Sequence, residues 1–229
     1  SLTHTNNPMR NNCGGNFVGW KSYRNTNITI HNCLAAPKSI SESSSFAPFV
    51  RHDSGSRNGI EINNGYYLNN IDIYNYTAQA LAKSSKEMAK GKICYLLNSG
   101  QEKQVWGQTI GSDALPVLTD DTNKGVYMVT FTVGGQVAKR FISNSPIGDK
   151  MPSGDDFGLK NATFTYNGAA FDGRTTFSSD PTIEVSGTTA FTMTLGTPEN
   201  GNISINNNTC MPGTLKKVTA VPADGYVVS

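Results

Sequence analysis

The sequence predicts a mainly β fold made of several modules, on three observations. Hydrophobic residues make up 37% of the chain and charged residues 16%, both below the usual values of about 45–50% and about 25%. Asn, Ser, Thr and Gly fill the difference, and these residues favour turns over helices. Short segments that alternate between apolar and polar residues occur before and after residues 84–98, the only stretch with helical spacing.

Charge and hydropathy exclude two classes of partner. The net charge is +2, and the longest basic runs are the pairs Lys139-Arg140 and Lys216-Lys217, whereas nucleic-acid binding needs a basic stripe. No apolar run reaches the roughly 18 residues of a membrane-spanning helix. The chain begins mid-pattern at Ser1 and ends in what reads as an interrupted strand, so we expect a fragment whose targeting signals lie elsewhere.

Residues 1–78 contain a repeat with an offset of 32 positions. Phe17-Val18 corresponds to Phe49-Val50, and the alternating segment 28–32 corresponds to 60–64, with a further alternating segment at 71–74. Period-2 strands repeated without a helix predict a β-solenoid, with a right-handed β-helix as the preferred form. Equivalent Ile residues would stack inside the coil. The Asn after each strand would lie at a corner, because Asn tolerates left-handed backbone geometry.

These residues resemble a known repeat. Phe17-Val-Gly-Trp20 followed by Ile28-Thr-Ile-His-Asn-Cys33 resembles the GLUG-type repeats of bacterial surface proteins. The second unit, 46–51 followed by 60–67, resembles the last such coil in proteins of the Bacteroidales. The resemblance implies a repeat protein of the cell surface.

Residues 79–118 are predicted to form a helical cap and an extended linker. Ser84 and Glu87 form a capping box, and Asn98-Ser-Gly100 ends the helix. We expect Gly91 to lie inside this single helix, where it allows close packing. The apolar stripe of Met88, Cys94 and Leu97 would cover the open end of the preceding coil.

The linker carries a second resemblance. Cys94-Tyr-Leu-Leu-Asn98, followed by Trp106-Gly-Gln-Thr-Ile-Gly-Ser-Asp-Ala-Leu-Pro-Val-Leu118, strongly resembles a segment of secreted and cell-surface Bacteroidales proteins. The resemblance implies an extracellular or cell-surface location and a modular build, and it names no catalytic residue. Trp106 and Asp113 are either a buried anchor and a turn residue, which we favour, or part of a ligand site.

Residues 125–188 are predicted to form a β module. Segments 126–133 and 136–142 alternate cleanly around Gly134-Gly135, a hairpin turn, and further strands follow at 161–166 and 181–186. The order of these segments resembles the Listeria–Bacteroides repeat, also called the internalin-type B repeat, although the family's G-W-Y is absent. The resemblance implies a small β-grasp-like unit that acts as a spacer or weak interaction module.

Residues 190–229 are predicted to form a partial or small further β repeat. Its segments are 191–195, 200–205, 211–214 and 218–226, and their G-x-I-x-I, P-G-T and V-T-A-x-P-x-x-G-Y patterns resemble bacterial surface repeats.

The sequence assigns no catalytic, cofactor-binding or metal-binding residue, and the ligand-binding residues are unknown. Asp121-x-Asn123-x-Gly125 begins like a calcium loop, but Val126 replaces the loop glycine and no Glu closes it. Asp155-Asp156 is interpreted as a cap or as solvated charge. The 17 acidic residues form no motif-defined pair. The histidines are scattered and are interpreted as surface or turn residues: His4, His31 and His52.

Cysteine and tryptophan residues leave alternatives open. The four cysteines form no CxxC pair, and their even number permits disulfides, but we favour small buried thiols; they are Cys13, Cys33, Cys94 and Cys210. Trp20 is expected in the core or at a cap, with an exposed sugar-stacking platform as the alternative.

These observations predict a non-enzymatic, adhesin-like or scaffold protein of the bacterial cell surface. Its expected partners are host or bacterial surface glycans or matrix proteins, with no cofactor. The alternatives are a polysaccharide-binding or polysaccharide-cleaving β-helix protein and a pure spacer.

Overall fold

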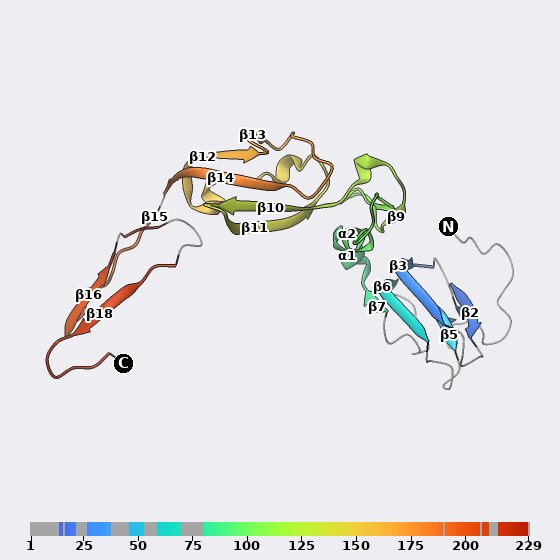
Figure 1. The fold of residues 1–229 in the computed structure, drawn as a ribbon, viewed down its shortest axis with the longest axis horizontal. Helices are drawn as coiled ribbons and strands as arrows, with labels where there is room; N and C mark the ends of the chain where they lie inside the picture. Colours follow the sequence, from blue (N-terminus) through green and yellow to red (C-terminus); the bar gives the residue numbers. More distant parts are fainter. Residues whose placement is uncertain are drawn as a thin grey trace. The chain divides into compact units, whose positions relative to one another are not determined.

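The computed structural model is mainly β, as the sequence predicts. The chain forms two compact units, residues 1–126 and residues 127–229 (Figure 1). The structure describes residues 14–15, 17–21, 27–37, 46–52, 59–69, 80–189, 191–206, 208–210 and 215–228. The predicted segment 71–74 lies outside these residues.

Parallel strand pairs organise the first unit. Three pairs join strands of the first repeat to strands of the second, and β7 (Leu81–Lys83) then pairs in parallel with the last of them. The three pairs are β1 (Gly14–Gly15) with β4 (Phe46–Ala47), β2 (Val18–Lys21) with β5 (Val50–His52), and β3 (Ile28–Ala35) with β6 (Ile60–Leu68).

The register of these pairs is the offset that the sequence predicts. Ile30 pairs with Ile62 and Val18 with Val50, each 32 positions apart. Ile30 is 8% exposed and Ile62 is 4% exposed, and both belong to a core that includes Phe49 and Val50. The predicted stacking of equivalent Ile residues is therefore confirmed for this pair.

The left-handed backbone predicted for two Asn residues is confirmed, but their predicted place at a corner after each strand is wrong, because Asn32 lies within β3 and Asn64 within β6. Asn32 has φ of 52° and Asn64 has φ of 53°, and both interrupt otherwise extended strands. Their side chains meet, because Asn64 Nδ2 donates to Asn32 Oδ1 at 2.9 Å. Gly65 follows in the second repeat where Cys33 stands in the first, and a Cβ at Gly65 would collide with the Ile62 side chain.

The prediction of a single helix over residues 84–98 is wrong, because this stretch forms two short helices. α1 (Ser85–Met88) and α2 (Lys92–Leu97) are separated at Gly91, whose φ of 81° lies in the left-handed region. Glycine enters that region without a steric penalty, so it breaks the helix here rather than packing within it. The capping box is confirmed: Glu87 N donates to Ser84 Oγ, and Ser84 N donates to the Glu87 carboxylate.

After α2, the first unit ends in a connection that we call the bridge and that spans residues 98–126. It contains the antiparallel pair β8 (Trp106–Gly107) and β9 (Val117–Leu118) and the 3-10 turn η2 (Thr122–Lys124). None of the described helices is long and apolar enough to cross a membrane.

A five-stranded mixed sheet organises residues 127–189. The predicted hairpin is confirmed, with β10 (Tyr127–Val133) and β11 (Gln136–Ser143) joined at Gly134-Gly135. The strand order is β11-β10-β14-β12-β13. The remaining elements are η3 (Gly148–Lys150), η4 (Gly154–Phe157), β12 (Leu159–Tyr166), β13 (Ala169–Ala170) and β14 (Thr182–Thr189).

One face of this sheet carries the core. Phe131 and Ile183 are fully buried on β10 and β14, and the connecting segment adds Phe157 beside them. Aromatic rings dominate the packing, with ring centroids of Phe131 and Phe157 5.6 Å apart.

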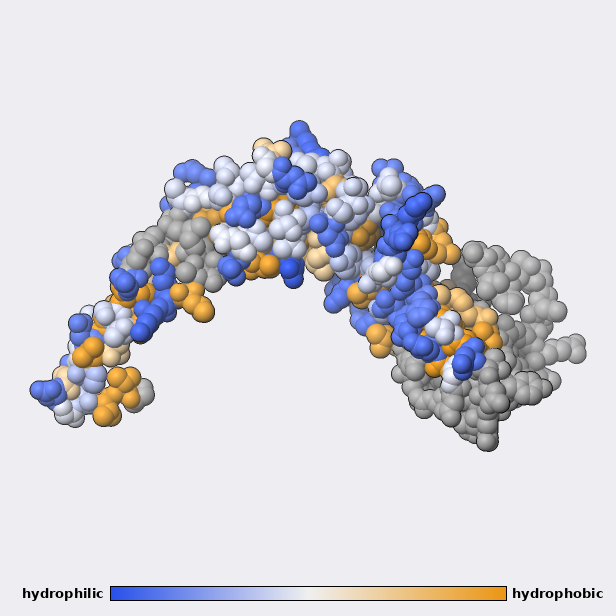
Figure 2. All heavy atoms as spheres, viewed as in Figure 1, coloured by the Kyte–Doolittle hydropathy of each residue, from blue (hydrophilic) through white to orange (hydrophobic). Residues whose placement is uncertain are grey.

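The remaining strands form two antiparallel ribbons. β15 (Phe191–Thr192) pairs with β17 (Thr209–Cys210), and β16 (Gly201–Ile205) pairs with β18 (Val218–Pro222). Hydrophobic side chains remain at the surface of the second ribbon (Figure 2), including Val221, which is 57% exposed.

Candidate functional site: the polar network of the bridge

The bridge contains the two residues that the sequence leaves open as ligand contacts, and the structure engages both internally. Trp106 is 9% exposed, and its Nε1 donates to the backbone oxygen of Asn32 at 3.1 Å. An indole whose only donor is used in this way packs as an anchor. The buried-anchor interpretation of Trp106 is therefore confirmed.

Asn98 fixes the start of the bridge. Its Oδ1 accepts from the backbone N–H groups of Val105 at 3.0 Å and Trp106 at 2.9 Å, and its Nδ2 donates to the Trp106 oxygen at 2.7 Å. One side chain thus closes the loop between α2 and β8. The sequence predicts only that Asn98 ends a helix.

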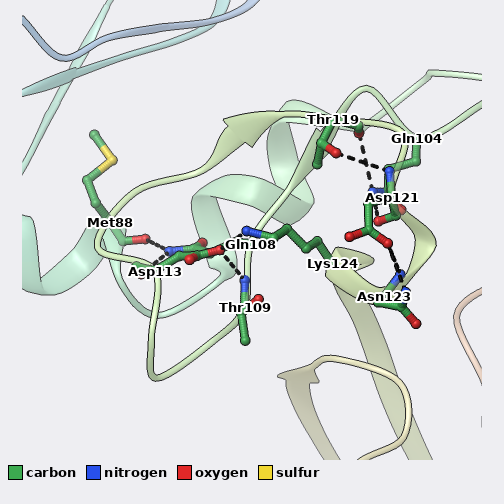
Figure 3. A network of polar contacts seen from close by, with 9 residues as sticks. All are labelled: Met88, Gln104, Gln108, Thr109, Asp113, Thr119, Asp121, Asn123 and Lys124. Atoms are coloured by element: carbon green, nitrogen blue, oxygen red, sulfur yellow. Dashed lines mark hydrogen bonds and ion pairs between the residues drawn. The ribbon is translucent and has the colours of Figure 1, made fainter.

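Gln108 lies at the centre of the network. Its side chain is 0% exposed, and its Nε2 donates to the backbone oxygens of Met88 at 2.9 Å and Asp113 at 3.1 Å (Figure 3). The amide therefore joins the end of α1 to a turn of the bridge. Buried backbone oxygens need such partners, because an unsatisfied one costs about 1–3 kcal/mol.

Asp113 and Lys124 close one side of the network. Asp113 Oδ2 accepts from Thr109 N at 2.8 Å and from Lys124 Nζ at 2.9 Å (Figure 3). The Thr109 backbone N–H, followed by the Lys124 ammonium, holds the pKa of Asp113 below its usual value. The carboxylate is therefore ionised near neutral pH and serves as a turn acceptor, as favoured from the sequence.

The calcium-like segment forms a turn. Asp121 Oδ1 accepts from the backbone N–H and from the side-chain amide of Asn123, both at 3.0 Å, and Gln104 Nε2 donates to the Asp121 backbone oxygen at 2.8 Å. Within the described part of the chain, no group of three His, Cys, Asp or Glu residues could hold a metal ion.

Two Asn side chains join the C-terminal end of α2 to β3 and β6. Asn32 Nδ2 donates to the Ser99 oxygen at 3.2 Å, and Asn64 Nδ2 lies 3.4 Å from the Leu96 oxygen. Leu96 lies in the last turn of α2 and Ser99 lies in the turn that follows, so successive residues at the end of this helix reach neighbouring strands. The end of α2 therefore lies along two neighbouring strands, rather than only over the last strand of the stack.

The other residues singled out from the sequence do not join this network. His31 is exposed on β3, and the Trp20 and His52 side chains and all of His4 and Cys13 lie outside the described part. Asp156 caps η4 by accepting from Ser153 N and also pairs with Lys139 Nζ at 2.6 Å, which confirms a cap.

The described cysteines form no disulfide: Cys33, Cys94 and Cys210 are thiols. Only Cys94 is buried, and burial, with a smaller effect of the nearby Asp113 charge, raises its pKa to about 12. That thiol is protonated at neutral pH and packs as an apolar group. Cys33 and Cys210 are only partly buried, so the prediction of buried thiols fails for these two.

Comparisons of the chain with protein-family models, with curated proteins and with solved structures gave no match. The bridge network consists of side chains that bond to backbone atoms of the same unit, together with the side-chain pairs Asp113–Lys124 and Asp121–Asn123. Gln108 and Lys124 were not predicted from the sequence. Their partners lie 20 and 11 positions away, so no local pattern marks them.

Proposed function

We propose that this chain is part of a non-enzymatic, modular bacterial cell-surface protein of the Bacteroidales type, with an adhesion, binding or scaffold role. The observation that carries the proposal is the parallel pairing of strands at the repeat offset of 32 positions. Repeats stacked in this way contact only their neighbours and form extended surfaces suited to binding.

In this proposal, residues 1–78 form coils of a β-solenoid. Residues 79–118 lie along the side of these coils and hold neighbouring strands together, an arrangement that we call the clasp. The pairing of Ile30 with Ile62 in the core, and the Asn32–Asn64 contact between the matching left-handed positions of β3 and β6, support coils of equal length. The contacts of Trp106 and Ser99 with Asn32 support a clasp along the side of the stack.

Residues 125–188 form a β-grasp-like module in this proposal. Its support is a mixed sheet in which the first and last strands, β10 and β14, are parallel neighbours at the centre. The 3-10 turns η3 and η4 lie in the connection where a β-grasp unit has its longer helix. The sheet order supports the resemblance to the Listeria–Bacteroides repeat.

The proposed contact surface is the exposed face of β3 and β6. Thr29 pairs with Glu61 and His31 with Asn63, and all four side chains are exposed. Asn63 Nδ2 donates to Glu61 Oε1 at 2.7 Å, which holds the carboxylate at this face. Such a row of hydroxyl, imidazole, carboxylate and amide groups can hydrogen-bond sugar hydroxyls.

The test is binding of the full chain to an array of host and bacterial surface glycans and to immobilised matrix proteins, with product analysis on every glycan that binds. We expect binding without cleavage. The double variant His31→Ala, Glu61→Ala should weaken it about tenfold or more, which corresponds to about 1.4 kcal/mol. Glu102→Ala is the matched control, because Glu102 is an exposed carboxylate of the same unit outside this face.

Each alternative is a distinct outcome of this test. Cleavage of a bound glycan would contradict a non-enzymatic role and would favour the β-helix enzyme. Absence of binding to every glycan and matrix protein would leave the spacer. If the double variant binds as well as wild type, a surface other than the exposed face of β3 and β6 is responsible for the binding.

A further inference from the structure

Two neighbouring strands of the five-stranded sheet are also the points at which the chain enters and leaves residues 127–189. β10 is the first strand and β14 the last strand of residues 127–189, and Figure 1 shows them side by side within the sheet. Tension transmitted along the covalent chain through this module therefore enters at Tyr127 and leaves at Thr189.

The parallel direction of these strands decides how such tension acts. Residues Thr130–Val133 pair in register with Thr182–Val185. Because β10 and β14 run the same way, Tyr127 and Thr189 lie at opposite ends of the pair. Force applied there slides one strand along the other and loads the four registered pairs together. Force applied at one end of the pair would instead open them one after another.

Buried side chains shield this junction from water. Phe131 and Ile183 are 0% exposed on the core side, and Thr130 and Thr132 are only 8% and 7% exposed on the opposite face. Hydrogen bonds in such surroundings are stronger than in water, because the local dielectric is low and water cannot replace either partner.

Side chains add bonds between the same two strands. Thr132 Oγ1 lies 2.9 Å from Glu184 Oε2 and 3.3 Å from the Ile183 oxygen. The Asp180 carboxylate, just before β14, accepts from Met128 N at 2.9 Å. Sliding β10 along β14 must therefore break these side-chain contacts together with the backbone hydrogen bonds between the two strands.

We propose that residues 127–189 form a mechanical clamp, so that the module bears tension along the chain between the segments on either side of it. This function needs no ligand and does not depend on the proposed binding face. A module at a surface under flow would thereby transmit pulling force without unfolding.

Single-molecule force spectroscopy on the full chain tests the clamp. In one geometry the handles are attached at the two chain ends. In the other they are attached at the N-terminus and, through a click handle, at Ser179, an exposed residue just before β14. The second geometry pulls β10 and β14 from the same end. Unfolding of this module is recognised by a gain in contour length of about 200 Å when the chain ends are pulled, and of about 175 Å when Ser179 carries the second handle, because fewer residues then lie between the handles.

We expect a several-fold higher unfolding force when the chain ends are pulled, up to about fourfold because four registered pairs share the load. Equal forces in the two geometries would overturn the proposal. This comparison leaves β10 and the Thr182–Val185 ladder unaltered, so it remains decisive if a variant fails to fold.

A matched pair of variants tests the side-chain contribution. Thr132→Val removes the hydroxyl contacts to β14 and preserves the shape. Thr130→Val alters the same strand and face, at a site where no side-chain bond to β14 is described. We expect Thr132→Val to lower the end-to-end unfolding force more than Thr130→Val. Equal or reversed losses would contradict the role of Thr132 in the clamp.

Discussion

Truncation of Leu97 should loosen the strands as well as the helix to which it belongs. Leu97 is 0% exposed on α2, and the end of that helix contacts Asn32 and Asn64 on β3 and β6. Replacing a buried Leu by Ala costs about 2–5 kcal/mol. One kcal/mol lowers Tm by roughly 4 °C for a unit of this size, so Leu97→Ala should lower the Tm of the first unit by about 8–20 °C. Leu97→Asp should lower it further, because it also buries a carboxyl group.

Differential scanning calorimetry gives the Tm, and hydrogen exchange followed by mass spectrometry shows which segments have lost stability. If α2 clasps the stack, amides of β3 and β6 exchange faster in Leu97→Ala than in wild type. Leu118→Ala is the control, because Leu118 is 56% exposed in the same unit, and its effect should remain within about 0.5 kcal/mol. An unchanged Tm, or faster exchange confined to α1 and α2, would refute the clasp.

Three further predictions concern the first unit. Gln108→Leu removes the amide that donates to the backbone oxygens of Met88 and Asp113. Urea unfolding should show a loss of about 1–3 kcal/mol for each of these oxygens that is left without a donor. Asn64→Ala should cost about 1–2 kcal/mol more than Asn64→Gly, because glycine adopts φ of 53° without strain and alanine does not. Hydrogen bonds from Ser84, followed by Lys83, hold the pKa of Glu87 at about 2. Because folding lowers this pKa from 4.5, the ionised Glu87 carboxylate stabilises the folded state above about pH 4.5. That stabilisation is lost as the pH falls towards 2.

Each of these has a control. Gln101→Leu alters an exposed amide of the bridge and should leave the urea midpoint unchanged, so an equal effect at both positions would argue against the network. Similar stabilities of Asn64→Ala and Asn64→Gly would show that backbone strain does not matter there. Glu87→Gln should flatten the Tm against pH between 6 and 2. If it follows the wild-type curve, the capping box does not contribute to acid sensitivity.

The bridge shows where prediction from sequence stops. The capping box was predictable, because Ser84 and Glu87 satisfy each other's backbone within one turn. Gly91 was not, because glycine is compatible with both a helix interior and the left-handed break that occurs. The break separates Met88 from Leu97, both 0% exposed, and allows two short helices to bury them.

The candidate site was predictable only in part. Trp106 and Asp113 stood out by residue type, and the structure gives both the internal roles favoured from the sequence. Gln108 did not stand out, since its buried position depends on Met88, 20 positions away. No spacing in the chain indicates that contact.

By itself, the sequence determined the register of the strands in the first unit and the β10–β11 hairpin. Both follow from local rules: the repeat offset of 32 positions aligns Ile30 with Ile62, and Gly134-Gly135 supplies a turn with positive φ. The tertiary structure alone decided that β14 inserts between β10 and β12, parallel to β10 and antiparallel to β12, and that the end of α2 lies along two strands. Those arrangements depend on which distant apolar faces and backbone oxygens meet, and alternation within a short segment carries no information about its partner.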